Sequence, residues 1–265
     1  NISENRWRDG PDLPKSLWLY GMASLVDDGR IFVIGGFGSS IDSNSVISLN
    51  PEKNKWTEMP PMKVGRFGHG TAVIENKIYA FGGHSAKCLG SVEVFDVKGG
   101  NWISDPVLIP PDMPTPRFHF GVAVIKHQIF VIGGYCESIA VSAAVEVLDT
   151  QTNTWSTLPS MPTARCFLSV AVIDDRFIWT FGGETHGNVI EIFDTKKNIW
   201  LDCPFRMNCD RNGGFAVAVD HKIFLIGGSN IFSKSVEILD VDTLKWTDAH
   251  PMTSSSRYWF SAIGF

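Results

Sequence analysis

Five arginines recur at one position of a repeated pattern. Each begins a nine-residue segment, such as RFGHGTAVI or RFHFGVAVI, and the five are Arg66, Arg117, Arg165, Arg211 and Arg257. A guanidinium group can hold a carboxylate through two parallel hydrogen bonds. Two interpretations stay open: the arginines bind an acidic partner, or each pairs with a neighbouring repeat or a backbone carbonyl. Recurrence in every repeat favours the structural interpretation.

Other residue types that do chemistry are scattered. The chain contains no CxxC, HExxH, GxSxG or P-loop motif. His69 and His119 come nearest to a metal-binding pair, but they stand three and two residues after their arginines. That offset of one residue sends the two side chains to opposite sides of a strand. We therefore predict no catalytic residue, no metal site and no cofactor.

Two adjacent glycines end a hydrophobic run five times, at residues 35–36, 82–83, 133–134, 182–183 and 227–228. A purely structural role would favour one residue type directly after each pair. Five different residues stand there instead, which indicates a varied binding surface on a fixed frame. They are Phe37, His84, Tyr135, Glu184 and Ser229. Phe37 and Tyr135, together with Trp259, are candidate aromatic anchors for a partner.

The elements that position these residues form a repeat of about 45–51 residues. Each repeat contains the arginine segment, a run such as IFVIGG, an acidic and apolar run such as VEVFD, and a tryptophan six residues later. The runs are short, rich in β-branched and aromatic residues, and bounded by turn formers. This pattern predicts four antiparallel strands per repeat. The tryptophans are Trp56, Trp102, Trp155, Trp200 and Trp246.

The composition of each run predicts its place in the sheet. GVAVI hardly alternates, so this strand should be buried on both faces near the centre, and VEVFD alternates, so it should have one solvent-exposed side. The tryptophans should pack as core residues near the rim. Glu-Asn, Lys-His, Asp-Asp and Asp-His pairs between the first two strands predict tight hairpins. Sheets of this kind bury both faces when they stack radially, as in a β-propeller.

The ordered pattern of diglycine, VExYD-like run, tryptophan and following methionine resembles the kelch repeat, and the resemblance covers the whole chain. It implies an all-β, six-bladed kelch β-propeller forming a single domain over residues 1–265. The repeats extend approximately over residues 17–62, 66–113, 117–161, 165–207 and 211–252. The third tryptophan-to-methionine interval departs from the pattern, because Met113 follows Trp102 by eleven residues and the loop is lengthened.

The two ends of the chain supply complementary parts of one further repeat. Residues 1–14 contain Trp7 without a diglycine of their own, and residues 257–265 contain an arginine segment with nothing after it. We therefore expect five complete blades and an incomplete sixth, whose two middle strands are missing from this chain.

Composition restricts the class of partner and the compartment. Charged residues make up 19% of the chain and the net charge is −5, which disfavours a nucleic-acid surface. No apolar stretch reaches the roughly 20 residues of a membrane span. The five cysteines are odd in number and irregularly spaced, so we expect reduced thiols in a cytoplasmic protein, with the nucleus as a further location. Cys203 and Cys209 are the only plausible local pair.

The closest resemblance is to the kelch domains of BTB–kelch and F-box–kelch ubiquitin-ligase adaptors. It implies a non-enzymatic domain that captures a protein or peptide target, while a cullin ligase binds through domains outside this chain. In kelch domains that recognise degrons, arginines at the repeated position can line the pocket, so Arg66 and Arg117 are the first candidates to reach solvent if the arginines bind a partner. An actin-associated or scaffolding kelch protein is the alternative. A copper-oxidase or sugar-epimerase type of kelch enzyme is a third, although no copper-oxidase motif surrounds the tyrosines.

Overall fold

The computed structural model describes residues 7, 10–14, 16, 18–24, 29–38, 43–228 and 234–252 of the chain. Within this part, the chain forms five four-stranded antiparallel sheets and two short hairpins. We call the sheets blade one to blade five in chain order. Each blade is built from consecutive strands, apart from the short hairpins that interrupt blades two and three.

The strand bounds repeat from blade to blade. Blade one contains β1 (Gly21–Ser24), β2 (Ile31–Ile34), β3 (Val46–Asn50) and β4 (Lys55–Met59). Blade two contains β5 (Gly70–Ile74), β6 (Lys77–Phe81), β9 (Val92–Asp96) and β10 (Asn101–Trp102). Blade three contains β11 (Gly121–Ile125), β12 (Gln128–Ile132), β15 (Val145–Asp149) and β16 (Thr154–Leu158).

Blade four contains β17 (Ser169–Ile173), β18 (Phe177–Phe181), β19 (Ile190–Asp194) and β20 (Ile199–Leu201). Blade five contains β21 (Phe215–Val219), β22 (Lys222–Ile226), β23 (Val236–Asp240) and β24 (Lys245–Ala249). The two hairpins follow the diglycines of blades two and three. They pair β7 (His84–Ser85) with β8 (Lys87–Cys88), and β13 (Tyr135–Cys136) with β14 (Ala140–Val141).

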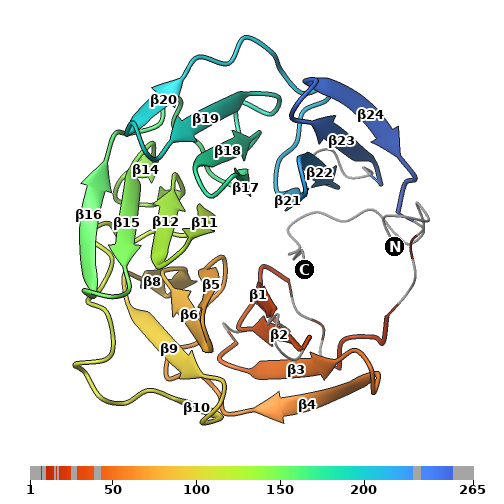
Figure 1. Cartoon of the computed structure of the whole chain (residues 1–265). Helices are drawn as coiled ribbons and strands as arrows, with labels where there is room; N and C mark the ends of the chain where they lie inside the picture. The colour runs from red at the N-terminus through yellow and green to blue at the C-terminus, as the bar shows by residue number, and fades with distance from the viewer. Residues whose placement is uncertain are drawn as a thin grey trace.

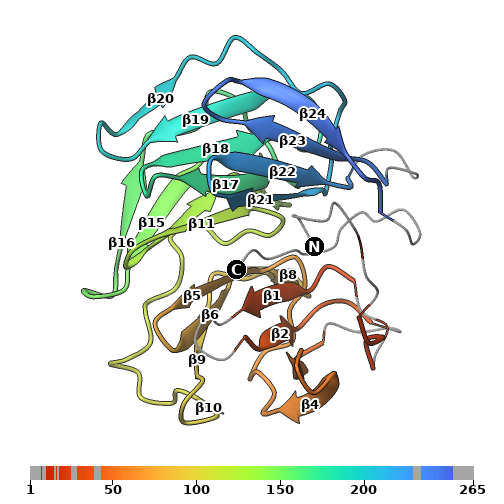
Figure 2. The same cartoon turned by 45° about the vertical axis from the view of Figure 1, so that its right-hand side comes forward.

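The five blades stand around a central axis, which confirms the predicted propeller (Figure 1). The arginine-segment strands β1, β5, β11, β17 and β21 lie innermost, and the tryptophan strands lie at the rim. Neighbouring first strands contact each other, as β17 and β21 do (Figure 2). The predicted order of strands from axis to rim is therefore confirmed.

The inner hairpins of blades two, three and five have two-residue loops, as the turn pairs predicted, and that of blade four has a three-residue loop. Ile125 pairs with Gln128 in the register of β11 and β12, so the loop consists of Lys126 and His127 alone. Lys126 has a φ of 55°. A left-handed residue in a two-residue loop matches the twist of the flanking strands.

The tryptophans pack between blades. The ring of Trp155 in blade three lies against a cluster that joins Phe81 and Val94 of blade two to Val131 and Leu148 of blade three. Its indole Nε1 donates a hydrogen bond to the carbonyl of Pro111 at 2.9 Å. Trp102 and Trp200 donate in the same way to Pro60 and Pro159. The predicted place near the rim is confirmed, but these three rings are half-buried and not enclosed in the core.

Two expectations about solvent exposure are wrong. The glutamates of the VEVFD-type strands are buried, and they are Glu93, Glu146, Glu191 and Glu237. The polar residues of the VEVFD-type runs therefore face buried arginines and not solvent. The first strands are not buried on both faces. In β11, Ala123 points to the buried face, while Val122 and Val124 point to the opposite face and are half-buried.

The incomplete sixth blade stays a prediction, because residues 1–6 and 253–265 lie outside the described residues. One contact supports it. Trp7 Nε1 donates to the carbonyl of His250 at 2.8 Å, which is four residues after Trp246. Trp102 makes the same contact with Pro60, four residues after Trp56. No helix in the described part of the chain has the length and apolar character needed to cross a lipid bilayer.

Candidate binding face at the diglycine loops

The repeated arginines are buried, so the interpretation in which Arg66 and Arg117 reach solvent is wrong. Arg66, Arg117 and Arg165 are 0% exposed and Arg211 is 3% exposed. Each forms an ion pair with the glutamate on the third strand of its own blade. The pairs are Arg66–Glu93, Arg117–Glu146, Arg165–Glu191 and Arg211–Glu237. Arg257 lies outside the described residues.

These ion pairs brace the loops of each blade. Arg66 Nη2 donates to Glu93 Oε1 at 2.8 Å, and its Nη1 donates to the carbonyl of Gly82 at 2.9 Å. The other carboxylate oxygen of Glu93 accepts from the amide of Lys63 at 2.7 Å. Burial lowers the pKa of the Arg66 guanidinium, while the charge of Glu93 opposes that change. The arginines therefore satisfy buried groups and are not available to a partner's carboxylate.

The diglycines join neighbouring blades. The amide of Gly83 donates to the carbonyl of Arg117 in the next blade at 3.0 Å, and the amide of Gly134 donates to that of Arg165 at 2.9 Å. Gly134 has a φ of 107°. A Cβ atom there would come within 2.9 Å of the Phe120 Cβ and 3.0 Å of the Phe118 carbonyl. Only glycine permits this backbone approach.

An open ring of backbone hydrogen bonds runs around the central axis from blade one to blade five. Each bond joins the residue two positions before a first strand to its counterpart in the preceding blade. The ring residues are Leu19, Gly68, His119, Phe167 and Gly213, and the four amide-to-carbonyl distances are 2.9, 2.8, 2.8 and 3.0 Å. All five have φ between 53° and 67°. The ring lines a cavity of about 260 Å³ at the axis.

An aromatic arc lies beside this ring. In blades one to three, an aromatic residue just before the first strand forms an isolated antiparallel bridge with the residue that follows the diglycine. We define the aromatic arc as these three bridged pairs, Trp18 with Phe37, Phe67 with His84, and Phe118 with Tyr135. The short bridges extend the ends of the blades and hold the aromatic rings in place.

The arc is continuous from ring to ring. Phe37 lies edge-on to Phe67 with centroids 5.5 Å apart, and Phe67 lies edge-on to Phe118 at 6.0 Å. Trp18, at the open end of the arc, is 51% exposed. Phe37, Phe67 and Tyr135 are half-buried. Preoriented aromatic rings with exposed faces can gain burial without losing much side-chain freedom, which is what a peptide-binding surface requires.

Blade four is acidic where blades one to three are aromatic. The corresponding residues are Cys166 and Glu184, and the Cys166 thiol donates to Glu184 Oε2 at 3.3 Å. Burial, with the carboxylate beside it, raises the pKa of this thiol to about 12. Glu184 is exposed. The described part of the face therefore combines an apolar arc with an adjoining carboxylate.

His69 and His119 are neutral and do not form a metal-binding pair. Burial lowers the pKa of both imidazoles to about 3. His119 stacks on Phe167 with centroids 3.8 Å apart. Among the described residues, the groups that could hold a metal ion include neither histidine.

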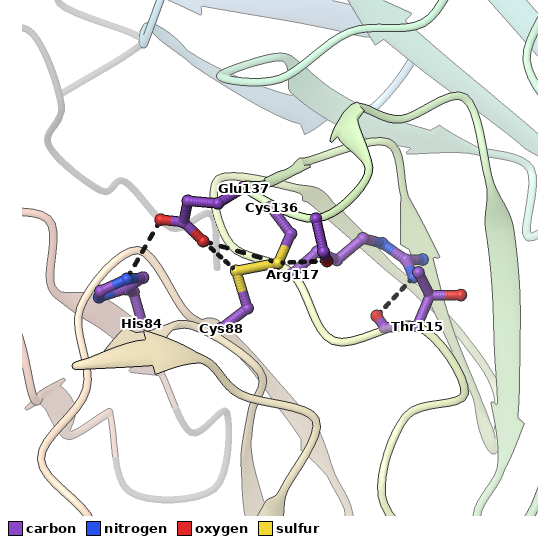
Figure 3. The surroundings of a disulfide bond; sticks show 7 residues. His84, Cys88, Thr115, Arg117, Cys136 and Glu137 are labelled. Carbon is purple, nitrogen blue, oxygen red and sulfur yellow. Dashed lines mark hydrogen bonds and ion pairs between the residues drawn. A yellow bond between two sulfur atoms is a disulfide. The ribbon is translucent and has the colours of Figure 1, made fainter.

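A disulfide joins the loops of blades two and three, so the expectation of reduced thiols is wrong for two of the five cysteines. Cys88 ends β8 in blade two and Cys136 ends β13 in blade three (Figure 3). Their Cα atoms are 6.0 Å apart. Cys203 and Cys209, the expected local pair, are both free. The sequence could not predict this disulfide, because the two cysteines are 48 residues apart and meet only where loops of neighbouring blades touch.

The structure places four predicted site residues on this face, namely Phe37, His84, Tyr135 and Glu184. Ser229 and Trp259 lie outside the described residues. Sequence reasoning missed Trp18, Phe67 and Phe118, the other members of the arc. The available signal was the Arg-Phe dipeptide of two repeats, which directed attention to the arginine and not to the ring after it.

The comparisons with known proteins agree with this architecture. Residues 3–134 and 68–264 match the family model described as the KLHDC2/KLHL20/DRC7 Kelch-repeats domain. Alpha-scruin of Limulus polyphemus is 27% identical over 250 residues, covering 84% of this chain and 26% of the relative. Kelch repeat and BTB domain-containing protein 2 of Ectromelia virus (strain Moscow) is 27% identical over 268 residues, covering 88% and 45%.

Kelch domain-containing protein 3 of Homo sapiens is 25% identical over 244 residues, covering 78% of this chain and 63% of the relative. The chain thus spans less than two thirds of the length of each of these relatives. The family model, by contrast, extends over nearly the whole chain. The chain therefore belongs to the kelch-repeat family and is a protein-interaction domain that resembles those of BTB–kelch proteins.

Proposed function

We propose that this chain is the target-recognition domain of a cullin-based ubiquitin-ligase adaptor, and that it binds a short protein segment across the aromatic arc. The observation that carries the proposal is the continuity of the arc over three blades, with Trp18 exposed at its open end. The resemblance to a BTB-containing relative supports the adaptor role. The ligase itself would bind through domains outside this chain.

The chemistry of the face favours an apolar or aromatic segment with a positive charge. The four described arginines of the repeat already hold glutamates, so they offer nothing to an acidic target. Exposed Glu184 instead provides a carboxylate next to the arc. An apolar anchor would enter between the rings, and a lysine or arginine beside it would face Glu184. We propose a cytoplasmic location, extending to the nucleus, and no catalytic role.

Capture of partners from cells, with and without a proteasome inhibitor, tests the adaptor role. The full-length protein should enrich ubiquitinated targets when the proteasome is inhibited, and the double variant Trp18→Ala/Phe67→Ala should lose them. Leu244→Ala is the matched control, because Leu244 is 48% exposed in the hairpin between β23 and β24. Capture that is insensitive to the inhibitor, together with co-sedimentation with actin filaments, would favour the scaffolding alternative.

A further inference from the structure

Three side chains that could hold a metal ion, Cys88, Cys136 and Glu137, meet where the loops of blades two and three touch, and His84 lies beside them (Figure 3). The sulfurs of Cys88 and Cys136 and a carboxylate oxygen of Glu137 all lie within 4.8 Å of one another. The other oxygen, Glu137 Oε1, lies 3.3 Å from His84 Nε2. The carboxylate thus stands between an imidazole and two sulfurs.

The spacing of Glu137 Oε2 from the two sulfurs is close to that of ligand atoms in a tetrahedral zinc site. Zinc bonds of about 2.3 Å to sulfur and about 2.0–2.1 Å to nitrogen or oxygen place the ligand atoms about 3.3–3.8 Å apart. Glu137 Oε2 lies 3.0 Å from Cys88 Sγ and 3.7 Å from Cys136 Sγ. Glu137 Oε2 is thus already near the required spacing from both sulfurs, while His84 lies 3.3 Å from the other oxygen, Oε1. The changes needed are separation of the two sulfurs and a movement of the His84 imidazole towards them.

The carboxylate of Glu137 has no donor in the disulfide. A carboxylate only accepts hydrogen bonds, and sulfurs joined to each other carry no hydrogen. Elsewhere in the structure, a thiol donates to the carboxylate beside it, as Cys166 does to Glu184 and Cys209 does to Glu237. A cation between Glu137 and two thiolates would give each of these groups a partner.

We propose that reduction of the Cys88–Cys136 disulfide creates a zinc site whose ligands are Cys88, Cys136, Glu137 and His84. A thiol reductant supplies the two electrons: two reductant thiols become a disulfide, and the two cysteines become thiols. Zn²⁺ then replaces the two thiol protons, which pass to solvent, and binds the two thiolates, the carboxylate and the neutral imidazole. Two thiolates with an imidazole select zinc over magnesium or calcium.

The same two loops are thus joined by a covalent bond in one state and by a metal ion in the other. His84 also belongs to the aromatic arc, with its ring 5.2 Å from Phe67 and 5.1 Å from Phe118. The site therefore sits at the edge of the binding face, but its existence does not depend on the identity of the partner.

Titration of the full chain with Co²⁺ tests the site directly, because thiolate ligation and tetrahedral geometry give cobalt distinctive visible and near-ultraviolet absorption. The reduced protein should bind one equivalent with this spectrum, and Zn²⁺ should displace it. The oxidised protein should show no such absorption. A thiolate spectrum in the oxidised protein, or its absence from the folded, reduced protein, would overturn the proposal.

Variants assign the ligands. Cys88→Ser/Cys136→Ser should abolish the thiolate spectrum. Glu137→Gln should weaken cobalt binding by at least the about 10–100-fold that loss of an outer-shell partner costs a metal site. Cys209→Ser is the matched control, since Cys209 is an exposed free thiol on another loop, and it should leave the titration unchanged. An unchanged titration in the double serine variant would place the metal elsewhere.

Alkylation of the reduced wild-type protein keeps the test independent of variant folding. Zn²⁺ should slow the reaction of Cys88 and Cys136 with iodoacetamide and leave the rate at Cys209 unaltered, as measured by peptide mass spectrometry. Equal slowing at all three cysteines, or none, would contradict the assigned site.

Discussion

The repeated arginine is the residue on which the two interpretations of the sequence differed most. An arginine at a loop end looks the same in sequence whether it faces solvent or a buried carboxylate. The difference depends on whether a carboxylate from elsewhere in the chain pairs with the arginine, and Glu146 lies 29 residues after Arg117. Because Glu146 is only 2% exposed, the pair belongs to the interior of blade three. Both residues of the ion pair are visible in the sequence. However, the strand that carries Glu146 alternates apolar and polar residues just as a half-exposed strand would.

Removal of one partner of this pair should destabilise the domain severely. Arg117→Ala leaves the Glu146 carboxylate buried without its cation, and breaking a buried pair in this way costs about 3–5 kcal/mol. The double variant Arg117→Met/Glu146→Met should recover much of the loss, because it removes both charges. Guanidinium titrations of the three proteins measure this cycle. A loss below about 1 kcal/mol for Arg117→Ala would show that the pair is solvated.

Acid stability should depend on His69. Burial lowers its pKa to about 3, whereas the unfolded imidazole has a pKa near 6.5. Between these values the unfolded chain binds a proton that the native protein does not, so the free energy of unfolding falls as the pH decreases from 6.5 towards 3. Above pH 6.5 this contribution is constant.

His69→Leu removes the titrating imidazole and puts an apolar side chain in its place. Blade four already has a leucine, Leu168, at the matching position. Denaturant titrations at pH 7 and pH 4.5 should show that the wild type loses about 2–3 kcal/mol more than the variant over this interval. His119 is present in both proteins and cancels. Equal losses in the two proteins would mean that His69 is protonated in the native state.

Strands, hairpins and tryptophans are the elements that the sequence predicted well. Period-two runs, turn dipeptides and the tryptophan spacing are local signals, and local geometry determines them. The bridges of the aromatic arc and the Cys88–Cys136 contact were not predicted, because each depends on how two loops meet. Phe37 and Tyr135 were recognised on one side of the bridges, while Phe67 and Phe118 on the other side were not.

The diglycine should tolerate no side chain at its second position. Gly134→Ala forces an L-residue to adopt a φ of 107° and brings a Cβ against Phe120 and the Phe118 carbonyl. We expect a loss of about 1–3 kcal/mol or more in a thermal or denaturant titration. Gly100→Ala is the control, because Gly100 also has a positive φ but its Cβ would have open space. Equal effects of the two substitutions would argue against the close approach of Phe118 and Phe120 to the backbone at Gly134.

The tryptophan strand should stabilise the contact between blades. Trp155→Ala removes the ring that packs on blade two, and we expect a loss of about 3–5 kcal/mol. Trp155→Phe keeps much of the packing but removes the hydrogen bond to Pro111, which should cost about 0.5–1.5 kcal/mol. A denaturant titration that finds less than about 1 kcal/mol for the alanine variant would show that the ring contributes little to inter-blade packing.

At the scale of the whole molecule, the contacts that hold the blades are the same in each repeat, whereas the residues on the binding face differ between repeats. Buried Arg–Glu pairs brace each blade, and diglycine contacts and the backbone ring hold neighbouring blades together. The residues above them differ, from the aromatic pairs of blades one to three to Cys166 and Glu184 of blade four. Binding sites commonly have this organisation, with variable loops on an invariant scaffold.

The most direct test of the central claim is the affinity of peptides selected by display against the whole domain. Peptides with an apolar or aromatic anchor and a nearby positive charge should be enriched. Their Kd, measured by calorimetry, should rise about tenfold or more in Trp18→Ala/Phe67→Ala, since buried aromatic anchors contribute about 2 kcal/mol or more. Leu244→Ala should leave it unchanged. Acidic peptides that bind the folded double variant and the wild type equally well would contradict the account.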